Sequence, residues 1–138
     1  MKEKYAEQIA KLLNERNGLI GEYTSEKILN KAGEYLFEVD DNDQVMAAIR
    51  TRRVQWYQAE IRHLVIHPSY EKRGFGKRMI LLAENSSRDR GLNFVQCTIR
   101  EDNIPARSLF EKCQYQMVNS FVYKKSEHTL TIWQKILQ

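Results

Sequence analysis

The sequence predicts an α/β domain built on a mixed, mostly antiparallel sheet with helices on both faces. Two strands, at about residues 61–66 and 93–99, bracket a helix, and a connection of this kind makes the strands parallel neighbours. Two hairpins, within residues 35–53 and 117–136, supply the antiparallel strands. With 138 residues, the chain is long enough for a single domain with a buried core, which we expect to span residues 1–138.

The composition narrows the class of protein. The hydrophobic fraction is 42% and the charged fraction is 29%, values typical of a soluble globular protein. No apolar segment has the length of a membrane span, and the first residues lack the apolar region of a signal peptide. Cys97 and Cys113 are not spaced as metal ligands, so we expect free thiols, no metal site and a cytoplasmic location.

The net charge of +4 indicates an anionic partner, and either nucleic acid or an anionic cofactor would satisfy it. A nucleic-acid surface would consist of Arg50, Arg52 and Arg53 beside Trp56 and Tyr57. Because no recognised reader motif accompanies these residues, we favour a solvated hairpin and an anionic cofactor.

The N-terminal part predicts two helices. The second runs from Ser25 to Ala32, with Thr24 or Ser25 as N-cap and Gly33 as its stop. The first stops before Gly18, and its buried face has helical spacing: Tyr5, Ala6, Ile9, Leu12 and Leu13.

Turn signals place the remaining elements. Residues 40–43 are Asp and Asn, which tolerate left-handed backbone, so they join strands 35–39 and 45–53 into a hairpin. The later elements are a strand at 57–66, a helix at 77–90 that ends at Gly91, a strand at 93–99, a helix at 105–113 opened by Pro105, and a closing hairpin of strands 117–123 and 128–136.

A glycine-containing turn joins the 57–66 strand to the next helix. Gly74 and Gly76 lie among basic residues just before that helix. Backbone N–H groups and the helix dipole favour an anion at such a place, and glycine lets the backbone approach it closely. The dinucleotide-binding pattern would need a third glycine where Met79 stands, and the phosphate-binding pattern of P-loop proteins is absent as well.

Two segments resemble a known family. Residues 65–76 read Val-Ile-His-Pro-Ser-Tyr-Glu-Lys-Arg-Gly-Phe-Gly, and residues 103–112 read Asn-Ile-Pro-Ala-Arg-Ser-Leu-Phe-Glu-Lys. The first resembles the acetyl-CoA-binding motif of the GNAT-superfamily N-acetyltransferases, and the second is similar to that family's Asn-x-x-Ala-x-x-Leu-Tyr-Glu-Lys motif. The resemblance implies a GNAT-like fold whose parallel strand pair is splayed, and acetyl-CoA as the cosubstrate.

The resemblance also assigns roles to residues. It implies that the turn amides bind the CoA pyrophosphate, that the strand before the turn pairs with pantetheine, and that the Leu64 amide stabilises the oxyanion. The Asn103 amide would bond pantetheine or position the attack. The implied cofactor-binding set is Leu64, Val65, Ile66, Glu71, Lys72, Arg73, Gly74, Phe75, Gly76, Lys77, Asn103, Phe110 and Lys112.

The sequence departs from the family pattern at four points. Glu71 stands where Gln or Arg is usual, and a carboxylate facing pyrophosphate is unfavourable unless it turns outward. The Tyr that is often the general acid is Phe110, and a family glycine is Gln114. The chain starts in the first helix, so the usual first edge strand is missing and the edge left exposed would pair with another subunit in a homodimer.

The reaction needs a base, because a lysine-like amine pays roughly 4.6 kcal/mol to lose its proton at pH 7. Glu60 is the first candidate, acting through water, since four strand residues span roughly 13 Å between it and Leu64. The alternative is an exposed carboxylate paired with Arg62 or Arg53. His63 is the second candidate, and strand alternation puts it on the opposite face from Glu60.

Other side chains have a functional and a packing interpretation. Tyr115 and Tyr123 could replace the general acid that is missing at Phe110. An acceptor pocket would be lined by Trp56, Tyr57 and Trp133. For each of these aromatic residues we favour packing in the core or at its edge. Cys97 reads as a core residue rather than a nucleophile.

The sequence therefore predicts an acetyl-CoA-dependent N-acetyltransferase acting on a primary amine, either a small molecule or a protein, with Glu60, Leu64 and Asn103 as catalytic candidates. One alternative is a catalytically weak acyl-CoA-binding or regulatory module. Another is transfer to a macromolecule, such as a protein amine or a charged tRNA.

Overall fold

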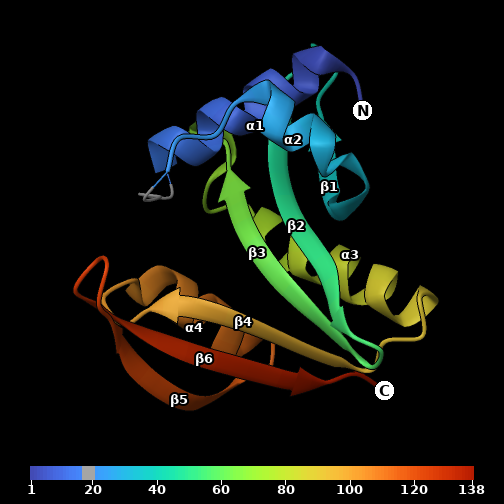
Figure 1. Ribbon diagram of the computed structural model, residues 1–138. Helices are drawn as coiled ribbons and strands as arrows, with labels where there is room; N and C mark the ends of the chain where they lie inside the picture. The colour runs from blue at the N-terminus through green and yellow to red at the C-terminus, as the bar shows by residue number, and fades with distance from the viewer. Residues whose placement is uncertain (17–20) are drawn as a thin grey trace. The chain divides into compact units, whose positions relative to one another are not determined.

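The computed structural model describes residues 1–16 and 21–138, which divide into two compact units. Unit 1 comprises residues 1–51 and 63–83, and unit 2 comprises residues 52–62 and 84–138. The six strands follow the order β1-β2-β3-β4-β6-β5 in the sheet (Figure 1). Three elements contribute residues to both units: β2 (Val45–Gln55), β3 (Gln58–Ile66) and α3 (Phe75–Asp89).

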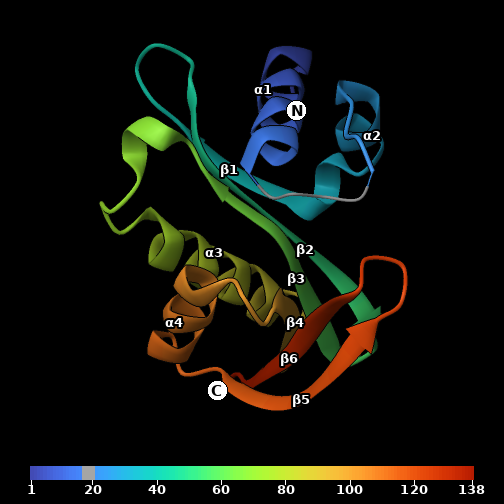
Figure 2. The same ribbon diagram turned by 90° about the vertical axis from the view of Figure 1, so that its left-hand side faces the viewer.

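Unit 1 begins with α1 (Glu3–Arg16) and α2 (Ser25–Asn30), which lie side by side in Figures 1 and 2. A short 3-10 turn, η1 (Ala32–Glu34), leads into β1 (Tyr35–Val39), which pairs antiparallel with β2. The amphipathic face expected for the first helix is confirmed, because it packs into the core of the unit. That core consists of Ala6, Ile9, Ala10, Leu12, Leu13, Ile28, Tyr35, Val45, Ala48 and Val65.

Unit 2 is built on β4 (Phe94–Arg100), β6 (His128–Ile136) and β5 (Gln116–Tyr123). β6 pairs antiparallel with both of the other strands, and α4 (Ile104–Lys112) connects β4 to β5. Buried side chains alternate along β4 and in the middle of β6, as expected for a sheet with one covered face, whereas β5 is exposed along almost its whole length. The buried apolar residues include Ile61, Val95, Cys97, Ile99, Phe110, Tyr115 and Trp133.

The parallel strand pair is confirmed, but its register differs from the expected one. β3 pairs with β4 from Gln58↔Phe94 to Ile61↔Cys97, rather than along residues 61–66. Two residues beyond this register, His63 has a φ of 54°, which is a left-handed conformation inside a strand. Such a residue interrupts the regular pleat, so the register could not be read from hydrophobic alternation alone.

Several element boundaries also differ from expectation. α3 begins at Phe75, two residues before Lys77, so both Phe75 and Gly76 belong to its first turn. α2 ends at Asn30, and Gly33 lies inside η1 instead of stopping the helix. Thr24 is the N-cap of α2, as expected, while Gly18 lies outside the described residues.

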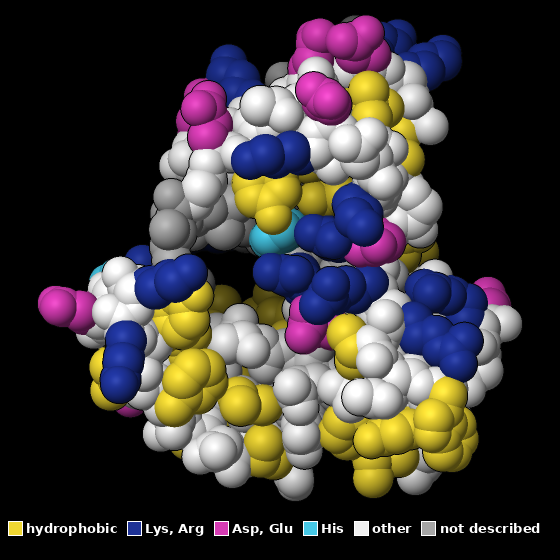
Figure 3. Space-filling model, viewed as in Figure 1, with side chains coloured by type: hydrophobic (Ala, Val, Ile, Leu, Met, Phe, Trp, Pro, Cys, Tyr) yellow, Lys and Arg dark blue, Asp and Glu magenta, His cyan; other side chains and the backbone are white. Residues whose placement is uncertain are grey.

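The edges of the sheet are β1 and β5. β5 carries no charged residue and exposes apolar side chains, which Figure 3 shows over the β5–β6 hairpin: Met117, Val118, Phe121 and Val122. Homodimer formation through a sheet edge stays a prediction. In residues 1–16 and 21–138, no helix is both long and apolar enough to span a bilayer.

Trp56 has 76% of its surface exposed, so the packing interpretation of this residue is wrong. It stacks edge-on against Tyr57, with ring centroids 5.0 Å apart, at the turn between β2 and β3. A two-residue turn at the end of a long hairpin places side chains in solvent, and this explains the exposure.

Candidate functional site

The glycine turn presents the N-terminus of α3. Lys72 has a φ of 59° and Gly74 a φ of 85°, so the chain reverses through two left-handed residues. The Gly74 carbonyl accepts the first helical hydrogen bond, from the Arg78 N–H at 3.1 Å. The N–H groups of the first turn have no acceptor within a helix, so they can be offered to an anion.

Two contacts fix the approach to this turn. The His67 ring accepts a hydrogen bond from the Ser69 N–H at 3.0 Å and so caps the short 3-10 turn η2 (Pro68–Tyr70). The Tyr70 hydroxyl donates to Asp40 at 2.6 Å, and this bond raises the pKa of Tyr70 and lowers the pKa of Asp40. The Phe75 ring packs edge-on against Tyr70, with centroids 5.5 Å apart.

The Glu71 carboxylate turns toward α1, where it forms an ion pair with Arg16. The negative charge of Glu71, which is unfavourable beside a phosphate group, is therefore partly neutralised by a residue distant in the sequence. Arg78 is engaged in the same way, because its guanidinium donates to Glu38 at 2.7 Å. The other basic residues around the turn, Lys72, Arg73 and Lys77, are exposed as well, and the Arg73 guanidinium donates to the Ser69 carbonyl at 3.3 Å. These observations fit the binding of a pyrophosphate.

The strand that precedes the turn places three further residues. Val65 is buried in the core of unit 1, while Leu64 and Ile66 are half-buried. This alternation is that of a strand with one face against the core. The strand ends where the His67 N–H donates to the Met46 carbonyl at 2.8 Å. Unit 1 thus brings together ten of the residues expected in the site: Leu64, Val65, Ile66, Glu71, Lys72, Arg73, Gly74, Phe75, Gly76 and Lys77.

The other expected site residues, Glu60, Asn103, Phe110 and Lys112, belong to unit 2. Glu60 is about a quarter exposed and pairs with Arg52 at 3.3 Å and with Arg62 at 3.6 Å. The expected partner Arg62 is confirmed. The alternative pairing of Glu60 with Arg53 is wrong, because the Arg53 guanidinium donates to the Gln55 carbonyl instead.

Asn103 is the N-cap of α4. Its side-chain oxygen accepts a hydrogen bond from the Ala106 N–H at 3.2 Å, which leaves the side-chain amide NH₂ as the group it can offer to a ligand. Phe110 is buried and packs edge-on against Tyr115, with centroids 5.1 Å apart. Lys112 is exposed at the end of the helix.

Tyr115 has a structural role in unit 2. Its hydroxyl donates to Glu84 at 2.7 Å, and the Lys135 ammonium contacts the same carboxylate at 3.1 Å. Burial raises the pKa of Tyr115 far above its usual range, and the buried hydroxyl bonded to Glu84 fits the packing interpretation of this residue. Burial likewise raises the pKa of the Cys97 thiol, which confirms Cys97 as a core residue.

Sequence reasoning missed the partners of His63. The hydroxyl of Tyr23 lies 3.0 Å from one ring nitrogen of His63, and the hydroxyl of Tyr35 lies 3.4 Å from the other. These tyrosines precede His63 by 40 and 28 residues, and no motif spacing links them. Only the folded chain could reveal this contact.

Comparison with known proteins decides the family. A family model described as the acetyltransferase (GNAT) family matches residues 5–115, well over half of the chain. The chain belongs to the GNAT family. It is accordingly an acetyl-CoA-dependent N-acetyltransferase of that family, with the mixed six-stranded sheet and the parallel β3–β4 pair expected of the fold. No curated protein sequence matches this GNAT chain.

Solved structures agree on the fold of this GNAT protein. Ard1 from Thermoplasma volcanium is 17% identical, with a TM-score of 0.85, over 100% of this chain and 95% of that one. YncA from Salmonella typhimurium, described as a putative acetyltransferase with its cofactor acetyl-CoA, is 15% identical, with a TM-score of 0.84 and coverages of 100% and 91%. The ribosomal-protein-S18-alanine N-acetyltransferase from Escherichia coli is 13% identical, with a TM-score of 0.79 and coverages of 100% and 91%.

Proposed function

We propose that this protein transfers the acetyl group of acetyl-CoA directly to a primary amine, with the CoA pyrophosphate bound at the N-terminus of α3. The observation that carries the proposal is the turn at residues 71–77. There Gly74 adopts left-handed backbone, the helix offers its first N–H groups, and Glu71 is drawn away to Arg16. Lys72, Arg73 and Lys77 add positive charge around the same turn.

The residues before the turn supply the path for the acyl chain. The pantetheine arm pairs with the backbone of Leu64, Val65 and Ile66 as an added strand would. The Leu64 amide then faces the thioester oxygen and stabilises the negative charge that develops on it. Leu64 directly follows His63, whose left-handed backbone sets it apart from the regular strand. The side-chain NH₂ of Asn103 bonds the pantetheine or positions the attack. Phe110 and Lys112 complete the proposed cofactor-binding residues, and Glu71 lies beside the pyrophosphate.

Glu60 is the proposed base that removes the first proton from an ammonium acceptor. Its distance from Leu64 along the strand, roughly 13 Å, requires a water molecule between the carboxylate and the amine. The ion pairs with Arg52 and Arg62 orient the carboxylate. Replacing Glu60 with Gln therefore lowers turnover without changing the affinity for acetyl-CoA.

The acceptor is a primary amine on a small molecule or a protein. The structural relatives include Ard1, two ribosomal-protein-alanine N-acetyltransferases and an aminoglycoside 6′-N-acetyltransferase. This range defines the panel to test: peptides with a free α-amine and blocked lysines, peptides with a free lysine and a blocked N-terminus, and an aminoglycoside.

The test has two parts. Calorimetry and thermal unfolding with CoA and acetyl-CoA measure binding, and a ligand that binds only the folded protein must raise its melting temperature. CoA release and mass spectrometry then report transfer to each amine of the panel. Binding without transfer to any amine would identify the catalytically weak acyl-CoA module instead, and failure to bind at millimolar ligand would remove both interpretations.

A further inference from the structure

Three side chains from separate segments of unit 1 meet around one imidazole, and we call them the His63 cluster. His63 comes from β3, Tyr35 from β1, and Tyr23 from the segment before α2. The Tyr23 hydroxyl lies 3.0 Å from His63 Nε2, and the Tyr35 hydroxyl lies 3.4 Å from Nδ1. The Tyr23 ring also meets the imidazole edge-on, with centroids 4.8 Å apart.

This arrangement suits an imidazole that gains and loses a proton. A hydroxyl can both donate and accept a hydrogen bond, so each ring nitrogen keeps a partner whether it carries a proton or not. The neutral ring donates to one hydroxyl and accepts from the other, and the protonated ring donates to both. Since both states are satisfied, the cluster can hold a proton and release it without leaving a polar atom unpaired.

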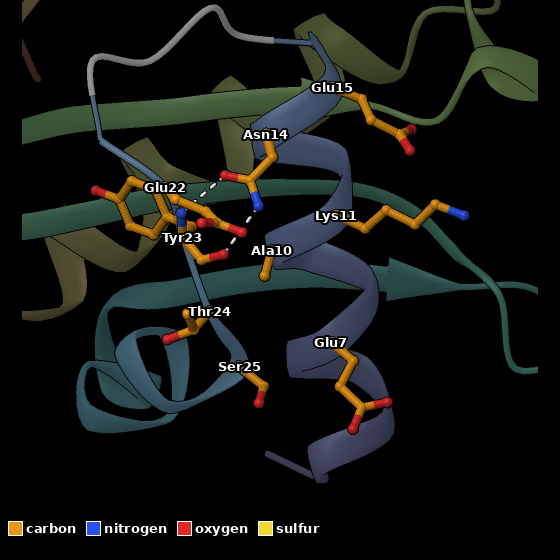
Figure 4. A pocket seen from close by; sticks show the side chains of 9 residues that line it. All are labelled: Glu7, Ala10, Lys11, Asn14, Glu15, Glu22, Tyr23, Thr24 and Ser25. Atoms are coloured by element: carbon orange, nitrogen blue, oxygen red, sulfur yellow. Dashed lines mark hydrogen bonds between the residues drawn. The ribbon is translucent and has the colours of Figure 1, made fainter.

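Tyr23 is held in place from its backbone. The Asn14 side chain donates to the Tyr23 carbonyl at 2.8 Å and accepts from the Tyr23 N–H at 2.8 Å. Figure 4 shows this reciprocal pair in the groove between α1 and the chain that leads to α2. Because these bonds use only backbone atoms of Tyr23, they hold its backbone in place independently of the bond between its hydroxyl and His63.

Imidazole is the only side chain of the cluster whose ordinary pKa lies near neutrality. Burial raises the pKa of Tyr35 to about 12, so its hydroxyl keeps its proton. Arg50 lies over the Tyr35 ring at 5.9 Å and is paired with Glu34 at 2.8 Å, and Lys27 lies 5.8 Å from the Tyr23 ring centroid.

The backbone of His63 is itself unusual. Its φ of 54° is strained for a residue other than glycine, and such residues gather at functional sites. The next residue is Leu64, the proposed oxyanion donor. The cluster is therefore one residue along the chain from the place where the thioester reacts in the proposed function.

We propose that His63, reached through the Tyr23 hydroxyl, takes the second amine proton in acetyl transfer and returns it to the CoA sulfur. The inference rests on the proposed function. An ammonium acceptor loses two protons on becoming an amide, and the first leaves through Glu60 and water. The second passes to Tyr23 as Tyr23 passes its own proton to His63 Nε2. The C–N bond forms, the C–S bond breaks, and the proton on the imidazole is carried by water to the departing thiolate. This supplies the role of the family tyrosine that Phe110 replaces.

Kinetics provide the first test. The rate of acetyl transfer to the best amine of the panel is measured across pH for the wild type, His63→Gln, Tyr23→Phe and the control His128→Gln, in which a histidine of β6 is replaced. We expect kcat to fall about 100-fold in His63→Gln and about tenfold in Tyr23→Phe, with no change in the Kd for CoA. The kcat of the control His128→Gln stays within twofold of the wild-type value. The limb of the pH profile near neutrality disappears in His63→Gln, whereas a purely structural role would leave the shape of the profile intact.

A second measurement does not depend on turnover. Nitrogen NMR of the ligand-free protein follows the titration and tautomer of the His63 imidazole in the wild type, Tyr23→Phe and Tyr35→Phe. We expect the titration midpoint to fall in both variants, because the protonated ring loses a hydroxyl acceptor. The His128 signal is the internal control and stays unchanged. An unchanged His63 titration in both variants would overturn the inference, even if no amine of the panel is acetylated.

The two proposals fail in distinguishable ways. If the wild type acetylates an amine and His63→Gln does so at the same rate, the inference on His63 is wrong and the proposed function stands. If the wild type binds no CoA by calorimetry, the proposed function is wrong, and the imidazole titration alone decides whether the cluster exists. If thermal unfolding shows that His63→Gln does not fold, Tyr23→Phe carries the test, because it removes only one oxygen atom.

Discussion

Replacing Gly74 with Glu tests most sharply the proposal that the turn at residues 71–77 binds the CoA pyrophosphate. The substitution places a carboxylate at the N-terminus of α3, where two negative charges of the pyrophosphate are expected. Unit charges 4 Å apart interact by about 1 kcal/mol in water and about 4 kcal/mol near a protein surface. A weakening of about 2–4 kcal/mol raises the Kd for CoA roughly 30- to 1000-fold.

Gly91 offers a matched control. Its φ of 76° is close to the 85° of Gly74, and a Cβ atom at either glycine would have no atom within 4 Å. Both Gly74→Glu and Gly91→Glu therefore carry the same backbone strain, about 1–2 kcal/mol, and the same change in charge. Calorimetry with CoA separates them, because only Gly74→Glu should lose affinity. Equal affinities in the two variants would refute the assignment of the turn, and thermal unfolding shows whether each variant still folds.

Three further predictions follow from the same contacts. Glu60→Gln should lower kcat at least tenfold with an unchanged Kd for acetyl-CoA, and unchanged turnover at every pH would eliminate Glu60 as the base. Tyr115→Phe should lower the free energy of unfolding by about 1–3 kcal/mol in urea, because it removes a buried hydrogen bond to Glu84, while kcat stays unchanged. The bond from Tyr70 lowers the pKa of Asp40, so its contribution to stability is present above the ordinary Asp pKa of 3.8 and is lost as the pH falls through the lower pKa of the folded state. Asp40→Asn should therefore flatten the acid limb of the stability profile, measured by urea unfolding between about pH 2 and pH 6; an identical acid limb would contradict this.

The sequence was informative where local rules decide the structure. The 35–39 strand, the 128–136 strand and the Thr24 cap follow from alternation, turn residues and capping preference, and the structure confirms them. The glycine turn before α3 could be predicted because glycine has a specific conformational role, and Gly74 does adopt the left-handed backbone that favours glycine.

The sequence was uninformative where residues distant in the chain meet. The ion pair between Arg16 and Glu71 joins positions 55 residues apart, and it reverses the concern that Glu71 faces the phosphate groups. The contact of His63 with Tyr23 and Tyr35 is of the same kind. Left-handed backbone at His63 could not be anticipated either, because histidine adopts it only when the surrounding structure enforces it.

The proposed transfer of an acetyl group from acetyl-CoA to a primary amine can be followed in the product itself. The most direct measurement is mass spectrometry of the amine panel after incubation with isotopically labelled acetyl-CoA, with wild-type protein and with Gly74→Glu. We expect at least one amine to gain the labelled acetyl group with the wild type, and the yield to fall at least tenfold with Gly74→Glu at limiting acetyl-CoA. Labelling of no amine by the wild type, or equal labelling by both proteins, would contradict it.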